Sequence, residues 1–114
     1  MEEKQKLVSI ILNCFNGEKY LKDALESVVN QTYNNWELVF WDNKSSDGSK
    51  KILDLYNSKK FKYYRSNVHT SLYDARNLAV KECKGEFIAF IDADDYWEKD
   101  KLEKQIKLFE KENV

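Results

Sequence analysis

Apolar residues gather in short runs along the chain, and between these runs they recur at helical spacing. Runs of the length of a β-strand lie at residues 7–12, 36–41, 61–65 and 87–91. The first run is rich in β-branched residues and almost continuous in its apolar character, which is typical of a strand covered on both faces. The pattern therefore predicts strands at these positions, with the first one inside a sheet.

The stretches that follow each run have the spacing of amphipathic helices. Predicted helices cover residues 18–31, about 45–56, 71–83 and 98–112. Ser71 and Asp74 resemble a capping box that opens the third helix. Leu102, Ile106 and Phe109 form one side of the last helix, which is otherwise strongly charged.

The order of these elements defines the expected fold class. Strands and helices alternate through the whole chain, and this alternation is typical of an α/β domain with a mostly parallel four-stranded sheet and helices on both faces. A length of 114 residues fits a single domain, residues 1–114. Since ligands of such sheets bind beyond the carboxyl ends of the strands, the residues just after each run are the candidates for function.

Composition excludes some function classes. Lys and Arg number 19 against 20 Asp and Glu, so the balance gives no support to a nucleic-acid partner. Cys14 and Cys83 are far apart and match neither a metal framework nor a redox pair. No run is long enough for a signal peptide or a membrane span, so we expect a cytoplasmic protein.

Acidic residues follow the predicted strands. Asp92, Asp94 and Asp95 stand just after the fourth run, and Asp42 follows the second. Clustered carboxylates repel one another unless a cation is present, and hard oxygen ligands suit Mg²⁺ or Mn²⁺. A turn followed by a helix cap is the alternative for the cluster, and an Asx turn is the alternative for Asp42. The position at the carboxyl end of a buried strand favours a metal site.

The motifs, taken in order, resemble those of a known family. The matching segments are Val8–Ile11, Phe15–Leu21, Ser27–Tyr33, Trp36–Leu38, Asp42–Gly48, Ala75–Asn77 and Gly85–Asp95. This series is similar to the nucleotide-sugar-binding, N-terminal part of family 2 glycosyltransferases of the GT-A type, and it covers nearly the whole chain. The resemblance implies a Rossmann-like GT-A fold and a nucleoside diphosphate sugar, a UDP- or GDP-sugar, as donor.

Further roles are implied only by this resemblance. Phe15 and Asn16 would lie along the base, Asp42 would accept a hydrogen bond from the base edge, and Arg76 would lie near the base or the diphosphate. From the residues alone, Arg76 also fits a surface pair with Asp74 or Glu82.

Asp92-Ala93-Asp94 matches the D-x-D motif of the family. Asp92 would reach the ribose and the water shell of the metal, and Asp94 would bind the Mn²⁺ or Mg²⁺ directly. The metal would neutralise the diphosphate leaving group. Asp95 fits either a supporting role or a cap.

The chain departs from the family pattern in three places. Asn13 stands where proline is frequent, Asn43 stands where a second aspartate is common, and Val68–Thr70 replaces a usual glycine. His69, in the last of these segments, is the only histidine, and we interpret it as a solvated loop residue outside the site.

The resemblance also implies what should lie beyond Val114. In inverting members a downstream group deprotonates the acceptor, so no catalytic base is assigned here, and we expect a truncated N-terminal portion of a longer enzyme. The acceptor would be a lipid-linked glycan, a surface polysaccharide or a protein, and the parent enzyme could be peripheral to the membrane. We also expect self-association through a partly exposed face of the 98–112 helix.

Other classes remain as alternatives. A catalytically silent nucleotide-binding module is one. A phospho-receiver-like domain would need an acidic pair where Asn13 stands, and a nucleotidyltransferase would need a glycine-rich basic loop where Asn13–Gly17 lies.

Overall fold

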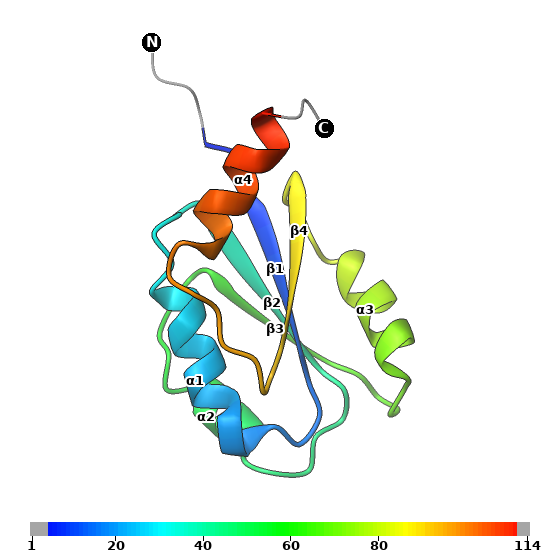
Figure 1. The fold of residues 1–114 in the computed structure, drawn as a ribbon. Coiled ribbons are helices and arrows are strands. Elements are labelled where there is room, and N and C mark those ends of the chain that lie inside the picture. The colour runs from blue at the N-terminus through cyan, green and yellow to red at the C-terminus, as the bar shows by residue number, and fades with distance from the viewer. Residues whose placement is uncertain (1–4, 112–114) are drawn as a thin grey trace.

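The computed structural model describes residues 5–111, which form a four-stranded parallel sheet in the order β3-β2-β1-β4 (Figure 1). The strands are β1 (Val8–Cys14), β2 (Trp36–Asp42), β3 (Phe61–Arg65) and β4 (Phe87–Asp92). The helices are α1 (Glu18–Val29), α2 (Ser49–Leu53), α3 (Leu72–Val80) and α4 (Lys101–Lys111). The predicted α/β class and the parallel sheet are confirmed.

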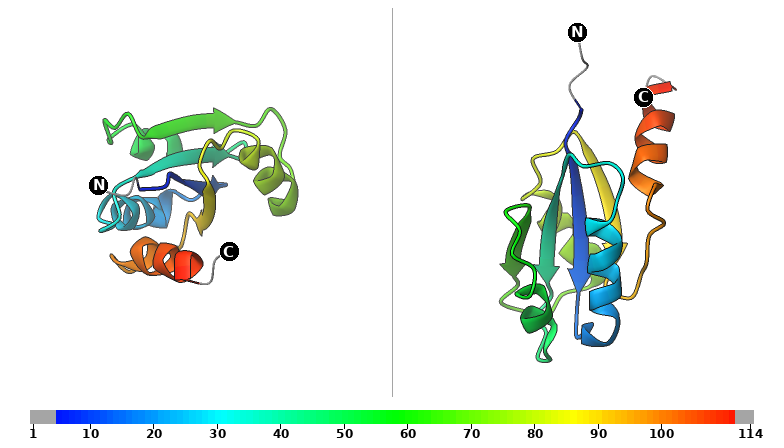
Figure 2. Two further views of the ribbon diagram at one scale, coloured as in Figure 1. Left: turned by 90° about the horizontal axis from the view of Figure 1, so that it is seen from above. Right: turned by 90° about the vertical axis from the view of Figure 1, so that its left-hand side faces the viewer.

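Helices cover both faces of the sheet, as expected (Figure 2). On one face, α1, α2 and α4 bury their apolar side chains against alternate residues of the strands, including Ile10, Leu38 and Ile91. On the other face, Ala75 and Ala79 of α3 pack against the intervening residues of β1 and β2. The small alanines let α3 approach the sheet closely, and this brings its first turn near the carboxyl ends of the strands.

Several helix ends differ from the sequence-based boundaries. The segment after Leu53 and the segment after Val80 continue as turns rather than as α-helix. The backbone N–H of Tyr56 donates to Leu53 O, and that of Cys83 donates to Val80 O. Both segments therefore form turns in which the hydrogen bond joins residues three apart rather than four apart, as in an α-helix. The last helix begins at Lys101 rather than at Glu98, and its expected end at Glu112 lies outside the described residues.

Strand β4 lies at the edge of the sheet, and only one of its faces is covered. Ile88 and Phe90 are 40% and 42% exposed, because α3 lies over β1 and β2 instead. The fourth strand, which the sequence analysis treated as buried, is therefore buried on one face only. The prediction of a strand covered on both faces holds for β1, in which every residue is buried, and every residue of β2 is buried as well.

The apolar side of α4 is more covered than the sequence indicated. Leu102 and Ile106 are buried in the core, whereas Phe109 is 37% exposed and stacks on Phe87 at 5.4 Å. Gln31 attaches the start of the helix, since its side chain donates to Glu98 O and accepts from the backbone N–H of Leu102. No helix within residues 5–111 has both the length and the apolar character to cross a bilayer.

Candidate nucleotide-binding site

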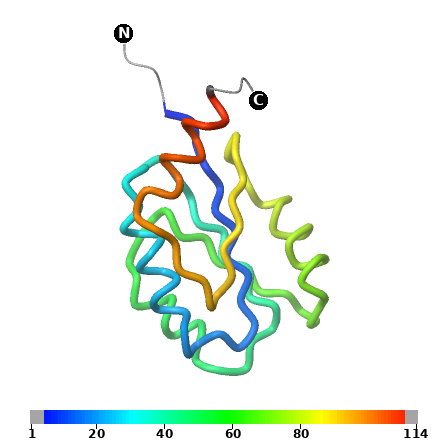
Figure 3. The backbone as a smooth tube through the Cα atoms, viewed as in Figure 1, coloured from blue at the N-terminus to red at the C-terminus, as the bar shows by residue number. Residues whose placement is uncertain are grey.

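The loops that follow the strands meet at one end of the sheet, at the lower end of the tube in Figure 3. The parallel register brings Asn13 of β1 opposite Trp41 of β2 and Asp92 of β4. Residues that are distant in sequence therefore share this edge, which is where the sequence analysis expected a ligand.

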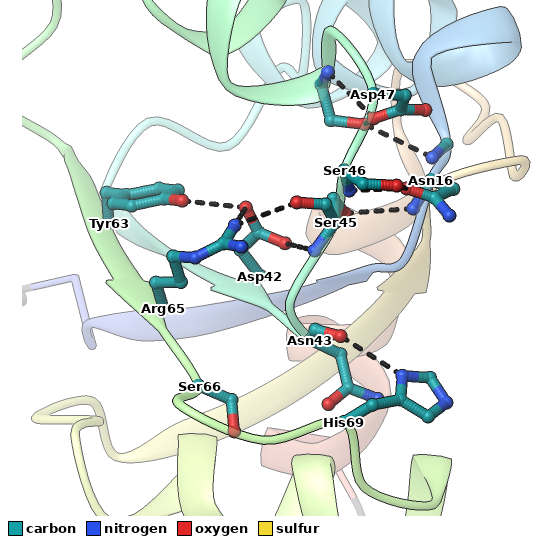
Figure 4. Close-up of polar contacts among 12 residues, drawn as sticks. Asn16, Asp42, Asn43, Ser45, Ser46, Asp47, Tyr63, Arg65, Ser66 and His69 are labelled. Carbon is teal, nitrogen blue, oxygen red and sulfur yellow. Dashed lines mark hydrogen bonds and ion pairs between the residues drawn. The ribbon is translucent and has the colours of Figure 1, made fainter.

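Asn16 joins the β1–α1 loop to the β2–α2 loop (Figure 4). Its backbone N–H donates to Ser45 Oγ at 2.9 Å, and its Oδ1 accepts from the backbone N–H of Ser46 at 2.8 Å. The residue has a positive φ of 50°, a conformation that asparagine tolerates better than most side chains. Asn16 thus fixes the two loops relative to each other and lies beside the predicted site.

The same two loops cap each other's helices. Asp47, just before α2, accepts from the backbone N–H of Glu18 at the start of α1, at 3.1 Å. In return, Glu18 accepts from the backbone N–H of Gly48 at 2.9 Å. Burial alone would raise the pKa of Asp47, but hydrogen bonds from Ser49 and from the backbone N–H of Glu18 outweigh it and lower that pKa. The carboxylates satisfy helix N–H groups and make the loops rigid.

Asp42 is buried at the end of β2, where its side chain contacts the β2–α2 loop and β3 (Figure 4). Its side chain is fully buried, and Oδ1 accepts from the backbone N–H of Ser45 at 2.8 Å. Oδ2 accepts from the hydroxyl of Tyr63 at 2.7 Å and from Nη1 of Arg65 at 3.2 Å. Burial, followed by the hydrogen bond to Asp42, raises the pKa of Tyr63 to about 12. The assignment of the base edge to Asp42 stays a prediction, because Oδ1 accepts one hydrogen bond and retains a second acceptor position, while Oδ2 holds Tyr63 and Arg65.

Asn43 holds the β3–α3 loop. Its Nδ2 donates to Thr70 O at 2.7 Å, and its Oδ1 accepts from the backbone N–H of Thr70 at 3.0 Å. This pair of bonds needs both a donor and an acceptor on one side chain, which an amide supplies and a carboxylate does not. Asn43 therefore acts as a clamp on the segment that carries His69.

His69 packs against Phe15, with ring centroids 4.1 Å apart and an interplanar angle of 51°. Its Nδ1 lies 3.1 Å from Asn43 O, an atom that only accepts, so Nδ1 carries the hydrogen and Nε2 is left as an acceptor in the neutral ring. His69 is exposed on its loop, as we interpreted it, but it also packs on Phe15 and borders a hollow at the site edge. Its place after the third strand was the signal that pointed to the site edge.

Two hollows adjoin at this edge. One, of about 290 Å³, is bordered by Asn43, His69 and Thr70, and the other, of about 410 Å³, by Asp92 and Asp94. Asn13 and Phe15 border both hollows. Phe15 is 50% exposed, so its ring is available for stacking.

Arg76 contacts the acidic end of this groove. Its Nη2 lies 3.3 Å from Oδ1 of Asp92, and its guanidinium lies over the ring of Phe90 at 5.2 Å. The alternative pairing with Asp74 or Glu82 is therefore not adopted. Asp94 is exposed, whereas Asp95 accepts a hydrogen bond from the backbone N–H of Tyr96 in the loop before α4.

The acidic residues fit one kind of metal site only. Among the described residues, no three potential ligands converge as they would in a site made by protein alone. Mg²⁺ and Mn²⁺, however, are often held by one or two carboxylates together with substrate phosphates. Asp92, whose side chain is 44% exposed, and the exposed Asp94 are suited to a site of that kind.

A parallel sheet whose strand-end loops gather an aromatic wall, an arginine and paired carboxylates has the arrangement of an α/β domain that binds a ligand at this edge. The chain belongs to glycosyl transferase family 2, whose sequence model matches residues 9–114. The predicted family and fold are thereby confirmed.

Curated relatives agree with this membership. A UDP-Glc:α-D-GlcNAc-diphosphoundecaprenol β-1,3-glucosyltransferase, WfgD of Escherichia coli, is 40% identical over 95% of this chain. The putative teichuronic acid biosynthesis glycosyltransferase TuaG of Bacillus subtilis is 36% identical over 94% of the chain. The chain spans 43% of the length of each of these two relatives.

Solved structures share the fold. The crystal structure of residues 1–349 of TarS from S. aureus superimposes with a TM-score of 0.85 at 30% identity, over 91% of this chain and 32% of that 1–349 chain. TarS has also been solved with UDP and with UDP-GlcNAc. A mannosyltransferase from Pyrobaculum calidifontis, solved with GDP-Man and Mn²⁺, shares the fold with a TM-score of 0.81 at 22% identity, over 90% of this chain and 32% of its own.

Proposed function

We propose that this chain binds the nucleoside diphosphate of a sugar donor and forms the donor-binding part of a glycosyltransferase. One observation carries the proposal: an aromatic wall, Phe15 with His69, and an acidic pair, Asp92 with Asp94, border adjoining hollows at the carboxyl edge of a parallel sheet. A base and a diphosphate need these two environments, side by side, in a single groove.

The side chains divide the work along the groove. The exposed ring of Phe15 stacks on the base, and such base–aromatic stacking contributes about 1–3 kcal/mol. Asp92 and Asp94 hold a Mg²⁺ or Mn²⁺ ion through their carboxylates, with the diphosphate completing the coordination. When bound, this ion supplies Lewis-acid stabilisation of the departing diphosphate. Arg76 holds Asp92 in place and adds positive charge beside the phosphates.

The donor we propose is a UDP-sugar. The relatives support this choice, because WfgD is named for UDP-Glc and TarS was solved with UDP and UDP-GlcNAc. The acceptor we propose is a glycan carried on a lipid diphosphate, as in the name of WfgD. No acid among the described residues is assigned as the catalytic base, since Asp42 and Asp47 are committed to internal hydrogen bonds and Asp92 and Asp94 to the donor.

Calorimetric titration tests the donor site. UDP and GDP are titrated separately into the chain, each with and without Mn²⁺, and the series is repeated on Asp94→Ala. The matched control is Asp95→Ala, which removes a neighbouring exposed carboxylate that serves only a backbone N–H. We expect Mn²⁺-dependent binding of UDP that Asp94→Ala abolishes and Asp95→Ala retains. Equal loss in both variants, or UDP binding that is indifferent to Mn²⁺, would contradict the proposed metal site.

A further inference from the structure

Ser9 and Glu37 form a buried polar pair near the start of β1 and β2, at the end of the sheet opposite the candidate site (Figure 1). They are cross-strand neighbours, and the Ser9 hydroxyl donates to Oε2 of Glu37 at 2.5 Å. Ser9 is fully buried and Glu37 is 4% exposed. Lys62 of β3 donates to the other carboxylate oxygen, Oε1, at 2.7 Å. Buried charges in proteins are paired or hydrogen-bonded, and both oxygens of Glu37 meet this requirement.

The pair also holds the backbone that leads into β4. The backbone N–H of Lys84 donates to Oε2 of Glu37 at 2.8 Å, and the next N–H, that of Gly85, donates to the Ser9 hydroxyl at 2.8 Å. Burial alone would raise the pKa of Glu37, but hydrogen bonds from Lys62, Ser9 and the N–H of Lys84 outweigh it and lower that pKa. Gly85 passes so close to β1 that a Cβ there would lie 2.7 Å from Ser9 Oγ. We call Ser9 and Glu37 the β4 latch.

Strand β4 has few neighbours that could fix its register. Within residues 5–111 it is an edge strand that pairs with β1 alone, and its α3 face is uncovered at Ile88 and Phe90. The difference between its two faces opposes a slip by one residue, which would turn every side chain to the other face. A slip by two residues keeps each side chain on its own face. The hydrogen bonds of the β4 latch oppose this second kind of slip, because they hold two particular N–H groups.

The register of β4 decides where the acidic pair lies. In the structure the β1–β4 ladder ends with Asn13 opposite Asp92. From Gly85 to Asp92 the extended chain runs for about 23 Å, and a shift at the start of the strand is carried to its end. A slip by two residues would move Asp92 and Asp94 by about 7 Å. Such a displacement is several times the distance of about 2 Å between a carboxylate oxygen and Mg²⁺.

We propose that Ser9 and Glu37 are positioning residues for the donor site. By holding the backbone that enters β4, they fix the register of this strand and so the place of the acidic pair at its other end. The importance of that place for metal binding rests on the proposed function, whereas the control of register can be measured without any ligand.

Nuclear magnetic resonance reads the register, because cross-strand nuclear Overhauser effects (NOEs) report which residues of two strands lie opposite each other. The test variant is Glu37→Leu, which has a side chain of similar bulk and removes the acceptor of the Lys84 N–H. The conservative variant is Glu37→Gln, whose remaining oxygen can accept from Ser9 and from Lys84. We expect Glu37→Leu to lose the NOEs that pair Asn13 with Asp92 while those between β1 and β2 stay. Glu37→Gln should keep both sets.

Calorimetry connects the register with the site. In Glu37→Leu the Mn²⁺-dependent affinity for UDP should weaken by about tenfold, as it would if about one chain in ten kept the native register. Glu37→Gln should bind UDP as the wild type does. Ser9→Ala removes the acceptor of the Gly85 N–H and one donor to Glu37, and it should show both changes to a smaller degree.

Val28→Ala is the control for a loss of stability alone. It opens a cavity in the core beneath α1, on the face of the sheet away from the β4 latch. This variant should lower the Tm but keep the β1–β4 NOEs and the affinity for UDP.

The outcomes are distinguishable. A folded Glu37→Leu that keeps Asn13 opposite Asp92 refutes the β4 latch, and loss of the β1–β2 NOEs together with those of β4 overturns it as well, since Glu37 would then be a general structural residue. If Glu37→Leu does not fold, Ser9→Ala decides by the same criteria. A folded wild-type chain that binds neither UDP nor GDP with Mn²⁺ overturns the proposed function and the positioning role, while the NOEs still decide whether the pair controls the register.

Discussion

Asp42→Asn tests whether Asp42 holds the site together or contacts the base. The substitution keeps one oxygen, which still accepts from the backbone N–H of Ser45. It replaces Oδ2 by an NH₂ group that faces the hydroxyl of Tyr63 and the guanidinium of Arg65. The variant therefore removes the ion pair with Arg65 and the charged acceptor of the Tyr63 hydroxyl, which is left with a neutral NH₂ group that only donates. It changes the shape of the side chain very little.

The magnitude follows from burial and charge. A hydrogen bond to a charged, fully buried acceptor contributes about 1.5–3 kcal/mol, and the bond from Tyr63 is of this kind. Arg65 is 45% exposed, so water screens its ion pair and the pair adds less than about 1 kcal/mol. We expect Asp42→Asn to lower the free energy of unfolding by about 2–4 kcal/mol.

Urea unfolding, followed by tryptophan fluorescence, measures this loss, since Trp41 is adjacent to the substitution. Tyr63→Phe serves as the second arm of a double-mutant cycle. In the wild type, Tyr63→Phe removes the charged hydrogen bond to Asp42, whereas in Asp42→Asn that charged bond is already lost. The double variant should therefore lose less free energy of unfolding than the sum of the losses in the two single variants. UDP affinity, measured under conditions where both variants are folded, should change little. If Asp42→Asn left the urea midpoint unchanged but greatly weakened UDP binding, the structural role would be refuted and Asp42 would instead contact the base.

Three further predictions concern the packing and polar contacts around the site. Gly85→Ala should destabilise the chain by about 1–3 kcal/mol in urea unfolding, because a Cβ there would lie 2.6 Å from the backbone N of Ser9, which cannot move aside; an unchanged midpoint would contradict this contact. Tyr63 should ionise with a pKa of about 12 against an ordinary 10.0, so the stability from its neutral form is complete below pH 10 and is lost as the pH rises to about 12. The part of the tyrosinate absorbance that disappears in Tyr63→Phe measures this pKa, and a tyrosine that titrates at 10.0 would refute the prediction. Asn43→Asp should lower the free energy of unfolding by about 1–3 kcal/mol, because the carboxylate cannot donate to Thr70 O. Asn77→Asp, at an exposed position on α3, is the control, and equal urea midpoints for the two variants would contradict the role of Asn43 as a clamp.

Sequence patterns predicted the elements well and their ends less well. The four strands follow from β-branched and aromatic runs, whose burial is set by the local alternation of side chains. The ends of α2 and α3 depend instead on which carbonyl each backbone N–H reaches, and near Tyr56 and Cys83 the three-residue bond replaces the four-residue one. Nothing in the local pattern of apolar residues distinguishes these two cases.

The candidate site was predicted in part for a similar reason. Phe15, Asp92 and Asp94 lie where the rule for parallel sheets places ligand-binding residues, and the structure has them at that edge. The burial of Asp42 could not be predicted, because it depends on Tyr63 and Arg65, which arrive from β3 through the pairing of β2 with β3. Long-range contacts of this kind are properties of the folded sheet and leave no periodic signal along the chain.

The departures from the family pattern, which look unrelated in the sequence, meet at one place in the structure. Asn43 clamps Thr70 with its amide, and the loop held in this way brings His69 against Phe15. Asn13 borders the same hollow of about 290 Å³ from the end of β1. A change at any one of these positions alters the wall that the other two share. Their common effect would be on the shape and the hydrogen-bonding pattern offered to the base, while the acidic end at Asp94 stays as the family has it.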